Sequence, residues 1–327
     1  MNAINSKALA VQVAIGFCVI ATGFAGAQSD GSPRSDHSLS PLETPMPAAY
    51  QARTRQLYVG TLEGDVRKIV DSENERPRDV GRIHKSPGNA ILRIRLDARR
   101  ERLWILDVGN VHVYDLARNQ LVRSIALPNW FYADDGSNCL PDLQLDRHGA
   151  AFVSDNVQPK LWRIDGDRFS VIERSVRLDS QRSVDAGFSA LAISEGGVMF
   201  AAMAAPGSLW RIDTGSFRAE RIQLNAPIHG ACAMETLGGV RSGELVVFVL
   251  ASGRARLDIR RIDMRPGSNQ AYIGTVAPDS VVAPASLLAW RGTLHLASNG
   301  AATASSQRVQ ADKAPFALRP VYKSDAN

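Results

Sequence analysis

A repeat with a period of 46 to 48 residues constrains the fold of this chain more than any other feature of its sequence. Apolar pairs that follow a turn recur along the chain, and one residue of each pair marks the repeat: Tyr58, Trp104, Phe152, Phe200, Val247 and Leu294. The successive intervals are 46, 48, 48, 47 and 47 residues. A constant spacing in this range is typical of repeat architectures, in which each repeat buries its core against its neighbours.

A second motif lies downstream of the first in the middle repeats. The string LWRID occurs twice, at Leu161–Asp165 and Leu209–Asp213, and Val113–Asp115 and Arg261–Asp263 occupy the equivalent places. Short apolar runs separated by turns such as Arg147–Gly149 indicate strands, and no segment holds a helical apolar stripe for three turns. Four strands in each repeat are typical of a propeller blade.

The repeats therefore predict an all-β fold, a six-bladed β-propeller with four antiparallel strands per blade. Six repeats account for the chain from about residue 46 to residue 322. A single blade cannot bury both of its faces, so we expect the blades to close into a ring. We place the propeller domain at residues 50–327.

The N-terminal segment predicts export. Met1–Lys7 carries one positive charge, Ala8–Thr22 is almost wholly apolar, and Ala25–Ala27 is a small-residue cleavage site. This pattern indicates a signal peptide at residues 1–27, with an uncleaved anchor as the alternative, and we expect a periplasmic or secreted protein. Residues 28–49 are rich in Ser and Pro and are expected to form a flexible leader.

Charge and cysteine content limit the partners and the cross-links. The 38 basic and 33 acidic residues are spread along the chain, and the cluster Arg99–Arg102 reads as a solvated turn, so we expect no nucleic-acid partner. No later segment is apolar enough to span a membrane. Cys139 and Cys232 fall in repeats that are not adjacent, and a disulfide requires Cα atoms within about 7 Å, so we expect two separate thiols.

The connection between the second and third repeats is the strongest candidate for a binding site. It is long, and it carries three consecutive aromatic residues, Trp130, Phe131 and Tyr132, followed by Asp135. Aromatic side chains in a surface loop are costly unless they pack or bind something. They are therefore either a packing element between blades or one wall of a ligand pocket.

Other polar residues are expected on the same face of the ring, where the connections between blades and the loops between second and third strands emerge. Asp142 follows Pro141 at the start of an innermost strand, where it is a candidate ligand-binding or metal-ligating carboxylate. Asp107 and Asp155 either bind ligand or cap their own loops as Asx turns. His229 is either a buried, hydrogen-bonded histidine or a catalyst. Asn89 and Asn299 complete the set of candidate ligand-binding residues.

Two family resemblances add to these expectations. The segment Leu103–Pro128, LWILDVGNVHVYDLARNQLVRSIALP, resembles the major royal jelly protein/yellow family, as do Pro141–Asn156 and Gly292–Asn299. That resemblance implies a secreted six-bladed propeller, and some members of the family bind small amines. It covers about half of the mature chain.

The second resemblance is to the SMP-30/gluconolactonase group. The string PDLQLDRHG is similar to that group's metal-binding segment, and the resemblance implies that Asp142 is a ligand of a divalent cation such as calcium. The group also has a glutamate before the first blade, whereas Glu63 falls after the first marker strand and Glu43 in the leader.

Three functions are compatible with these features. The first, which we favour, is a binding module that holds a small molecule at the mouth of the channel. The second is a metal-dependent lactone or ester hydrolase, in which a cation polarises the carbonyl. The third is a protein-interaction platform. The sequence contains no P-loop, GxGxxG, HExxH, EF-hand or GxSxG motif, which removes several common reaction classes.

Overall fold

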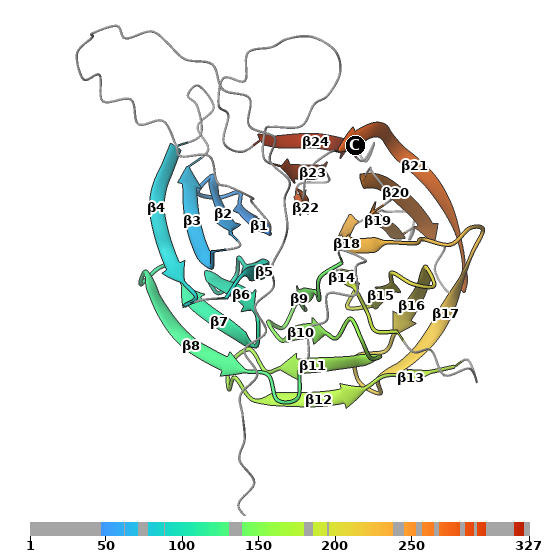
Figure 1. Cartoon of the computed structure of the whole chain (residues 1–327), viewed down its shortest axis with the longest axis horizontal. Coiled ribbons are helices and arrows are strands. Elements are labelled where there is room, and N and C mark those ends of the chain that lie inside the picture. The colour runs from blue at the N-terminus through green and yellow to red at the C-terminus, as the bar shows by residue number, and fades with distance from the viewer. Residues whose placement is uncertain are drawn as a thin grey trace, which may run out of the picture. The chain divides into compact units, whose positions relative to one another are not determined.

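A computed structural model describes residues 47–61, 63–70, 78–87, 89–130, 139–179, 186–194, 196–237, 245–252, 257–264, 268–281, 285–290, 293–298 and 317–323. All of them belong to one compact unit, Ser38–Asn327. Within these ranges the regular structure is entirely β, and the described residues contain no helix that could span a membrane. The strands form successive antiparallel sets arranged in a ring, which is a β-propeller (Figure 1).

We number these sets blades 1 to 6 in chain order. Blade 1 contains β1 (Ala48–Gln51), β2 (Gln56–Gly60), β3 (Asp65–Val70) and β4 (Arg78–Lys85). Blade 2 contains β5 (Ile91–Asp97), β6 (Arg102–Asp107), β7 (Asn110–Asp115) and β8 (Gln120–Ala126). Blade 3 contains β9 (Leu143–Leu145), β10 (Ala151–Ser154), β11 (Lys160–Ile164) and β12 (Val171–Ser175).

Blade 4 contains β14 (Ala190–Ile193), β15 (Met199–Met203), β16 (Ser208–Ile212) and β17 (Arg218–Leu224), with β13 (Arg177–Leu178) paired parallel to β17. Blade 5 contains β18 (Ala231–Leu237), β19 (Leu245–Ser252), β20 (Leu257–Met264) and β21 (Gln270–Val281). Its outer strand also pairs with β17, which joins blades 4 and 5 into one sheet. Blade 6 contains β22 (Ala285–Trp290), β23 (Thr293–Ser298) and β24 (Ala317–Lys323).

The repeat in the sequence corresponds to these blades. Each of the six marker residues lies on the second strand of its blade, from Tyr58 on β2 to Leu294 on β23. The second motif lies on the third strand of blades 2 to 5, as Trp162 on β11 and Trp210 on β16 illustrate. Within the described residues the strands thus fall into six sets, the number of repeats in the sequence, and the sixth set contains three strands where four were predicted.

The core lies between the blades, and the alternation of side chains along each strand explains why. On β6, Leu103 and Ile105 pack with blade 1, whereas Trp104 and Leu106 pack with blade 3. On β10, Phe152 packs with blade 4 and its neighbours with blade 2. Both faces of the inner strands are buried, so these strands read as continuous apolar runs, without the apolar–polar alternation of a half-exposed sheet.

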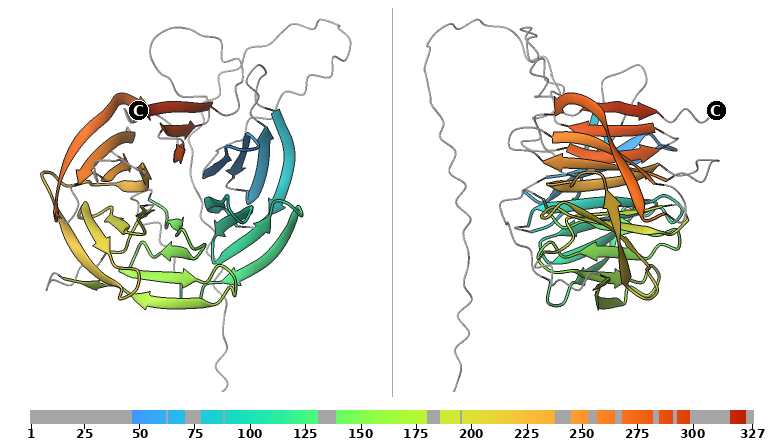
Figure 2. Two further views of the ribbon diagram at one scale, coloured as in Figure 1. Left: turned by 180° about the vertical axis from the view of Figure 1, so that it is seen from behind. Right: turned by 90° about the vertical axis from the view of Figure 1, so that its right-hand side faces the viewer.

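The same packing closes the ring. The innermost strands contact one another in the order β1, β5, β9, β14, β18, β22 and back to β1. Leu288 of β22 packs with Leu57, Val59 and Ile69 of blade 1, so the last blade shares a core with the first. Figure 2 shows the same arrangement from behind and from the side.

The interface between blades 1 and 2 provides a test of this packing. Leu103 is completely buried there, and Leu103→Ala is expected to destabilise the protein by about 2–5 kcal/mol, because the neighbouring blade cannot collapse into the cavity. The matched control is Leu121→Ala on the outer strand β8, where the side chain is 45% exposed and the cost is expected to be within about 0.5 kcal/mol. Urea unfolding measures both, and equal midpoints for the two variants would contradict the interblade core.

Candidate functional site

A network of four charged side chains crosses the axis of the ring. Asp142, which precedes β9, is fully buried, and its Oδ1 accepts a hydrogen bond of 3.1 Å from Arg93 Nε. Arg95 Nη2 lies 3.5 Å from the same oxygen and 3.2 Å from Glu235 Oε1. These residues come from β5, from the start of blade 3 and from β18, so charges that are far apart in the sequence meet at the centre.

Asp142 is held at every side of its carboxylate. Besides the two arginines, the backbone N–H of Leu143 donates to Oδ1 and that of Leu191 on β14 donates to Oδ2, each at 2.8 Å. Burying a carboxylate is costly unless such partners compensate the charge. Asp142 therefore ties blades 2, 3 and 4 together, and its backbone N–H is fixed by Ser154 Oγ at 2.8 Å.

These contacts do not fit a divalent cation. A hard cation needs several oxygen ligands, and the oxygens of Asp142 already accept hydrogen bonds from two guanidinium groups and two backbone N–H groups. The positive charges of Arg93 and Arg95 would repel a second cation at this position. Among the residues with described positions, no group of three His, Cys, Asp or Glu side chains is arranged to hold a metal ion.

Arg93 closes the network on the face where the connections between blades emerge. We name it the connection face, and its described residues are 86, 87, 89, 90, 127–130 and 139–142. Its Nη2 donates to the carbonyl oxygens of Leu140 at 3.0 Å and Cys232 at 2.8 Å. Burial lowers the pKa of the Arg93 guanidinium, although the Asp142 carboxylate opposes that shift. The segment before β9 is thus bound to the innermost strand of blade 5 across the axis.

A disulfide between Cys139 and Cys232 makes the same link covalently, so the expectation of two separate thiols is wrong. The two Cα atoms lie 4.5 Å apart, within the range that a disulfide requires. The expectation failed because it placed each cysteine on its own blade. Cys139 instead belongs to the connection that precedes β9, which reaches the start of β18 at the axis, where residues of non-adjacent blades converge.

A cavity of about 510 Å³ lies on the other side of this network. The inner strands β1, β5, β18 and β22 supply its walls, and its lining extends to Ala52, Arg53 and Ala98 in the turns between first and second strands. We name this side the turn face (residues 52–55 and 98–101). Since β5 runs from the connection face to the turn face, Arg93 is on the closed side and Arg95, two residues later, lines the cavity.

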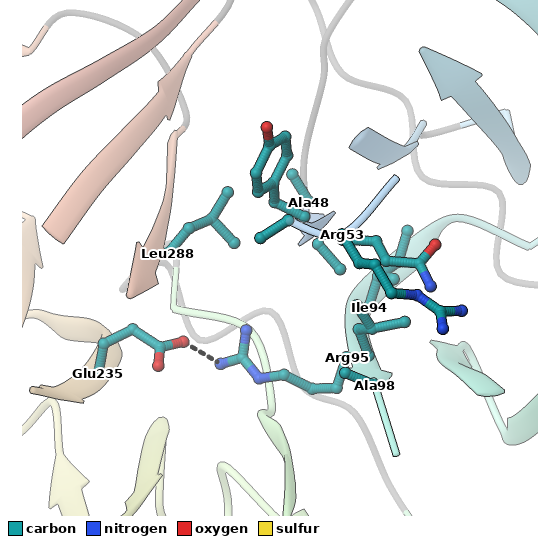
Figure 3. A pocket seen from close by; sticks show the side chains of 12 residues that line it. Ala48, Arg53, Ile94, Arg95, Ala98, Glu235 and Leu288 are labelled. Carbon is teal, nitrogen blue, oxygen red and sulfur yellow. Dashed lines mark ion pairs between the residues drawn. The ribbon is translucent and has the colours of Figure 1, made fainter. Parts of the chain in front are cut away.

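Arg95 and Glu235 are the polar groups at the inner end of the cavity, and Figure 3 shows Arg95 reaching across it toward Glu235. Both ion pairs of Arg95 use Nη2, and its Nε is buried without a hydrogen-bond partner among the described residues. Burial raises the pKa of Glu235 to about 7, with Arg95 opposing the shift and Asp142 adding to it. Around them the walls are apolar, including Ala49, Ile94 and Leu288.

The candidate residues from the sequence are distributed differently from the expectation. Trp130 is buried in the core between blades 2 and 3, and its indole N–H donates to the carbonyl of Ser154 at 3.0 Å, which is the packing alternative. Phe131, Tyr132, Asp135 and Asn299 lie outside the described residues. His229 is exposed beside β18, so the expectation that it is buried is wrong.

Asp155 and Asp107 both cap loops, as their Asx-turn alternative predicts. Asp155 Oδ1 accepts hydrogen bonds from the backbone N–H groups of Val157 and Gln158 at 2.7 and 2.9 Å, although burial raises the pKa of its carboxyl. Asp107 Oδ1 accepts one from Asn110 N–H at 2.9 Å. Neither residue lines the cavity.

Asp107 also belongs to a second polar cluster, between blades 1 and 2. Its Oδ2 lies 2.9 Å from His112 Nε2 and 3.4 Å from Asn89 Nδ2, and it accepts a hydrogen bond from Ser86 Oγ. Burial would raise the pKa of Asp107, but the hydrogen bonds from His112 and Ser86 outweigh it and lower the pKa. Ser86 is fully buried, so this cluster supports the interface and does not expose a nucleophile.

Arg93, Arg95 and Glu235 form most of the network, and none of them was predicted from the sequence as a site residue. A signal for them was present: β5 reads ILRIRLD, and two arginines on an inner strand that is otherwise buried require anionic partners. Glu235 is likewise the only charged residue of β18. Charged residues on innermost strands were a better guide to the axis than polar residues in loops.

Comparisons with known proteins agree with the fold. Neither a family model nor a curated protein sequence matches the chain. By structure it is similar to hydrazine synthase from Kuenenia stuttgartiensis, with a TM-score of 0.54 and 14% identity over 83% of this chain and 78% of that chain. It is also similar to virginiamycin B lyase from Staphylococcus aureus, with a TM-score of 0.51 and 10% identity over 78% of this chain and 92% of that chain. At these identities the likeness shows a shared β-propeller fold.

Proposed function

We propose that this protein binds a small molecule in the axial cavity, which the ligand enters from the turn face. The observation that carries the proposal is Arg95, a largely buried guanidinium that lines a cavity of about 510 Å³ and has a nitrogen without a described partner. A concave, mostly apolar site with a few polar groups is the usual form of a small-molecule site. The proposed ligand therefore lies on the turn face, whereas the sequence predicted a ligand on the connection face.

The closed connection face supports entry of the ligand from the turn face. The disulfide and the Arg93 hydrogen bonds occupy the axis at the connection face, whereas the turn residues Arg53 and Ala98 line the cavity. A metal-dependent hydrolase is not proposed, because the Asp142 carboxylate is engaged by arginines. The shared fold with a synthase and a lyase does not add to the proposal, since one fold hosts many functions.

Export remains part of the proposal. The disulfide supports it, since disulfides persist mainly in oxidising compartments. The signal-peptide pattern at residues 1–27 points to the same compartment.

Blocking the cavity tests the proposed site. Ala98 is an exposed turn residue at the cavity, so Ala98→Trp is expected to fill its mouth at little cost to folding. The matched control is Ala117→Trp, in an exposed turn of the same blade that does not line the cavity. Saturation-transfer NMR with a set of small acids, amines and neutral polar molecules is expected to find binders that Ala98→Trp and Arg95→Gln lose and Ala117→Trp keeps. Absence of any binder, or binders that ignore both cavity variants, would refute the site.

A second test measures how much the buried carboxylate of Asp142 stabilises the ring. Because Asp142→Asn leaves two arginines with less countercharge, the variant is expected to lose about 3–5 kcal/mol of unfolding free energy. Asp167→Asn, whose side chain is 75% exposed, is the control and is expected to cost less than about 0.5 kcal/mol. Chemical denaturation checks both, and an unfolding free energy for Asp142→Asn equal to that of the control would show that the buried network does not support the ring.

A further inference from the structure

We propose that the ligand of the axial cavity is a monoanionic carboxylic acid with an apolar body, and that it binds together with one proton, which Glu235 takes up. This inference rests on the proposed function and names the ligand class of the same site. It follows from the number of charges at the inner end of the cavity and from the way in which each of them is held.

The first step is the charge count. Arg93 and Arg95 supply two positive charges, and Asp142 and Glu235 supply two negative charges when both are ionised, so the network is then neutral. Arg53, at the mouth, is 75% exposed and paired with Glu101. With Glu235 protonated, the inner end carries one excess positive charge, which one monoanion neutralises and a dianion exceeds.

The second step is to identify which of the two carboxylates takes up the proton. Asp142 and Glu235 share one nitrogen of Arg95, at 3.5 and 3.2 Å. A third carboxylate at that guanidinium would face both negative charges unless one is neutralised. Asp142 is also held by Arg93 and by two backbone N–H groups, whereas the Glu235 carboxylate has no partner other than Arg95 within the described part of the chain. Glu235 is therefore the group that accepts the proton.

Among the described strands, those that pack against β18 contain no other ionisable group that would take this role. The strands packed against β18 are β14, β19 and β22, and their sequences ALAI, LVVFVLAS and ASLLAW contain no acid or base. Across the axis, Arg95 and Asp142 are the charged groups that act on it. The pKa of Glu235, raised to about 7 by burial, agrees with a carboxyl that takes up a proton near neutrality.

The step balances in charge and in protons. The ligand arrives as R–COO⁻, one proton comes from solvent, and Glu235–COO⁻ becomes Glu235–COOH, whose O–H donates to the ligand carboxylate. The guanidinium of Arg95 donates to the same carboxylate, and charge-assisted hydrogen bonds of this kind are the stronger ones. The apolar walls at Ala48, Ile94 and Leu288 then accommodate the body of the ligand.

Titration calorimetry with 3-phenylpropanoate tests the inference, with the neutral 3-phenylpropanamide as the matched probe. Because only the protonated form of Glu235 is competent, and its pKa is about 7, the Kd of the wild type is expected to rise roughly 25-fold between pH 6.5 and pH 8.5. Near pH 7.5, buffers of different ionisation enthalpy should report uptake of a proton. The Glu235→Gln variant keeps a neutral donor, so its Kd is expected to stay constant with pH, and no proton uptake should be seen.

Glu220→Gln, on the exposed side of β17, is the control and should keep the pH dependence of the wild type. Binding of the acid with a pH-independent Kd, or equal binding of the amide, would overturn the inference while the cavity site stands. A third outcome is that the acid does not bind, whereas amines or neutral molecules bind the wild type and not the Ala98→Trp variant. In that case the ligand class is wrong and the site is right. If no molecule of any class binds, the proposed function itself fails.

Discussion

The buried carboxylate of Asp142 is the interaction on which the centre of this propeller depends. It accepts hydrogen bonds from the side chains of two arginines on blade 2, from its own blade and from the backbone of blade 4. Through Arg93 and Arg95 the network continues to Cys232 and Glu235 on blade 5. The interblade cores join neighbouring blades, whereas at the axis these charged side chains join blades 2 and 5, which are not neighbours.

The network also divides the axis into two unequal ends. Toward the connection face, Arg93 and the disulfide join the segment before β9 to β18, and toward the turn face, Arg95 and Glu235 end an open cavity. The two arginines therefore have different roles. Arg93 donates its hydrogen bonds to Asp142 and to backbone carbonyls, whereas Arg95 retains a nitrogen without a described partner. The guanidinium of Arg95 in the proposed site is fixed in position, since the ion pairs that hold it also join the blades.

The fold was predictable from the sequence because it is encoded by repetition. An apolar marker residue such as Trp104 or Phe152 packs between blades, and because each blade needs one, the repeat is visible in the sequence. The axis was not predictable in the same way, because its contacts join residues as far apart as Arg93 and Cys232, and no local pattern carries that information. Asp142 was identified as a residue of the axis, but its partners decide its chemistry, and they make it a counter-ion for arginines.

The most direct test of the closed connection face is a peptide map of the purified protein, digested without reduction after free thiols have been alkylated. The account predicts one linked peptide pair that contains Cys139 and Cys232, separated by reduction, and no alkylation at either residue before reduction. Alkylation of both cysteines in the folded, unreduced protein would contradict it, since the segment before β9 would then not be tied across the axis and the connection face could admit a ligand.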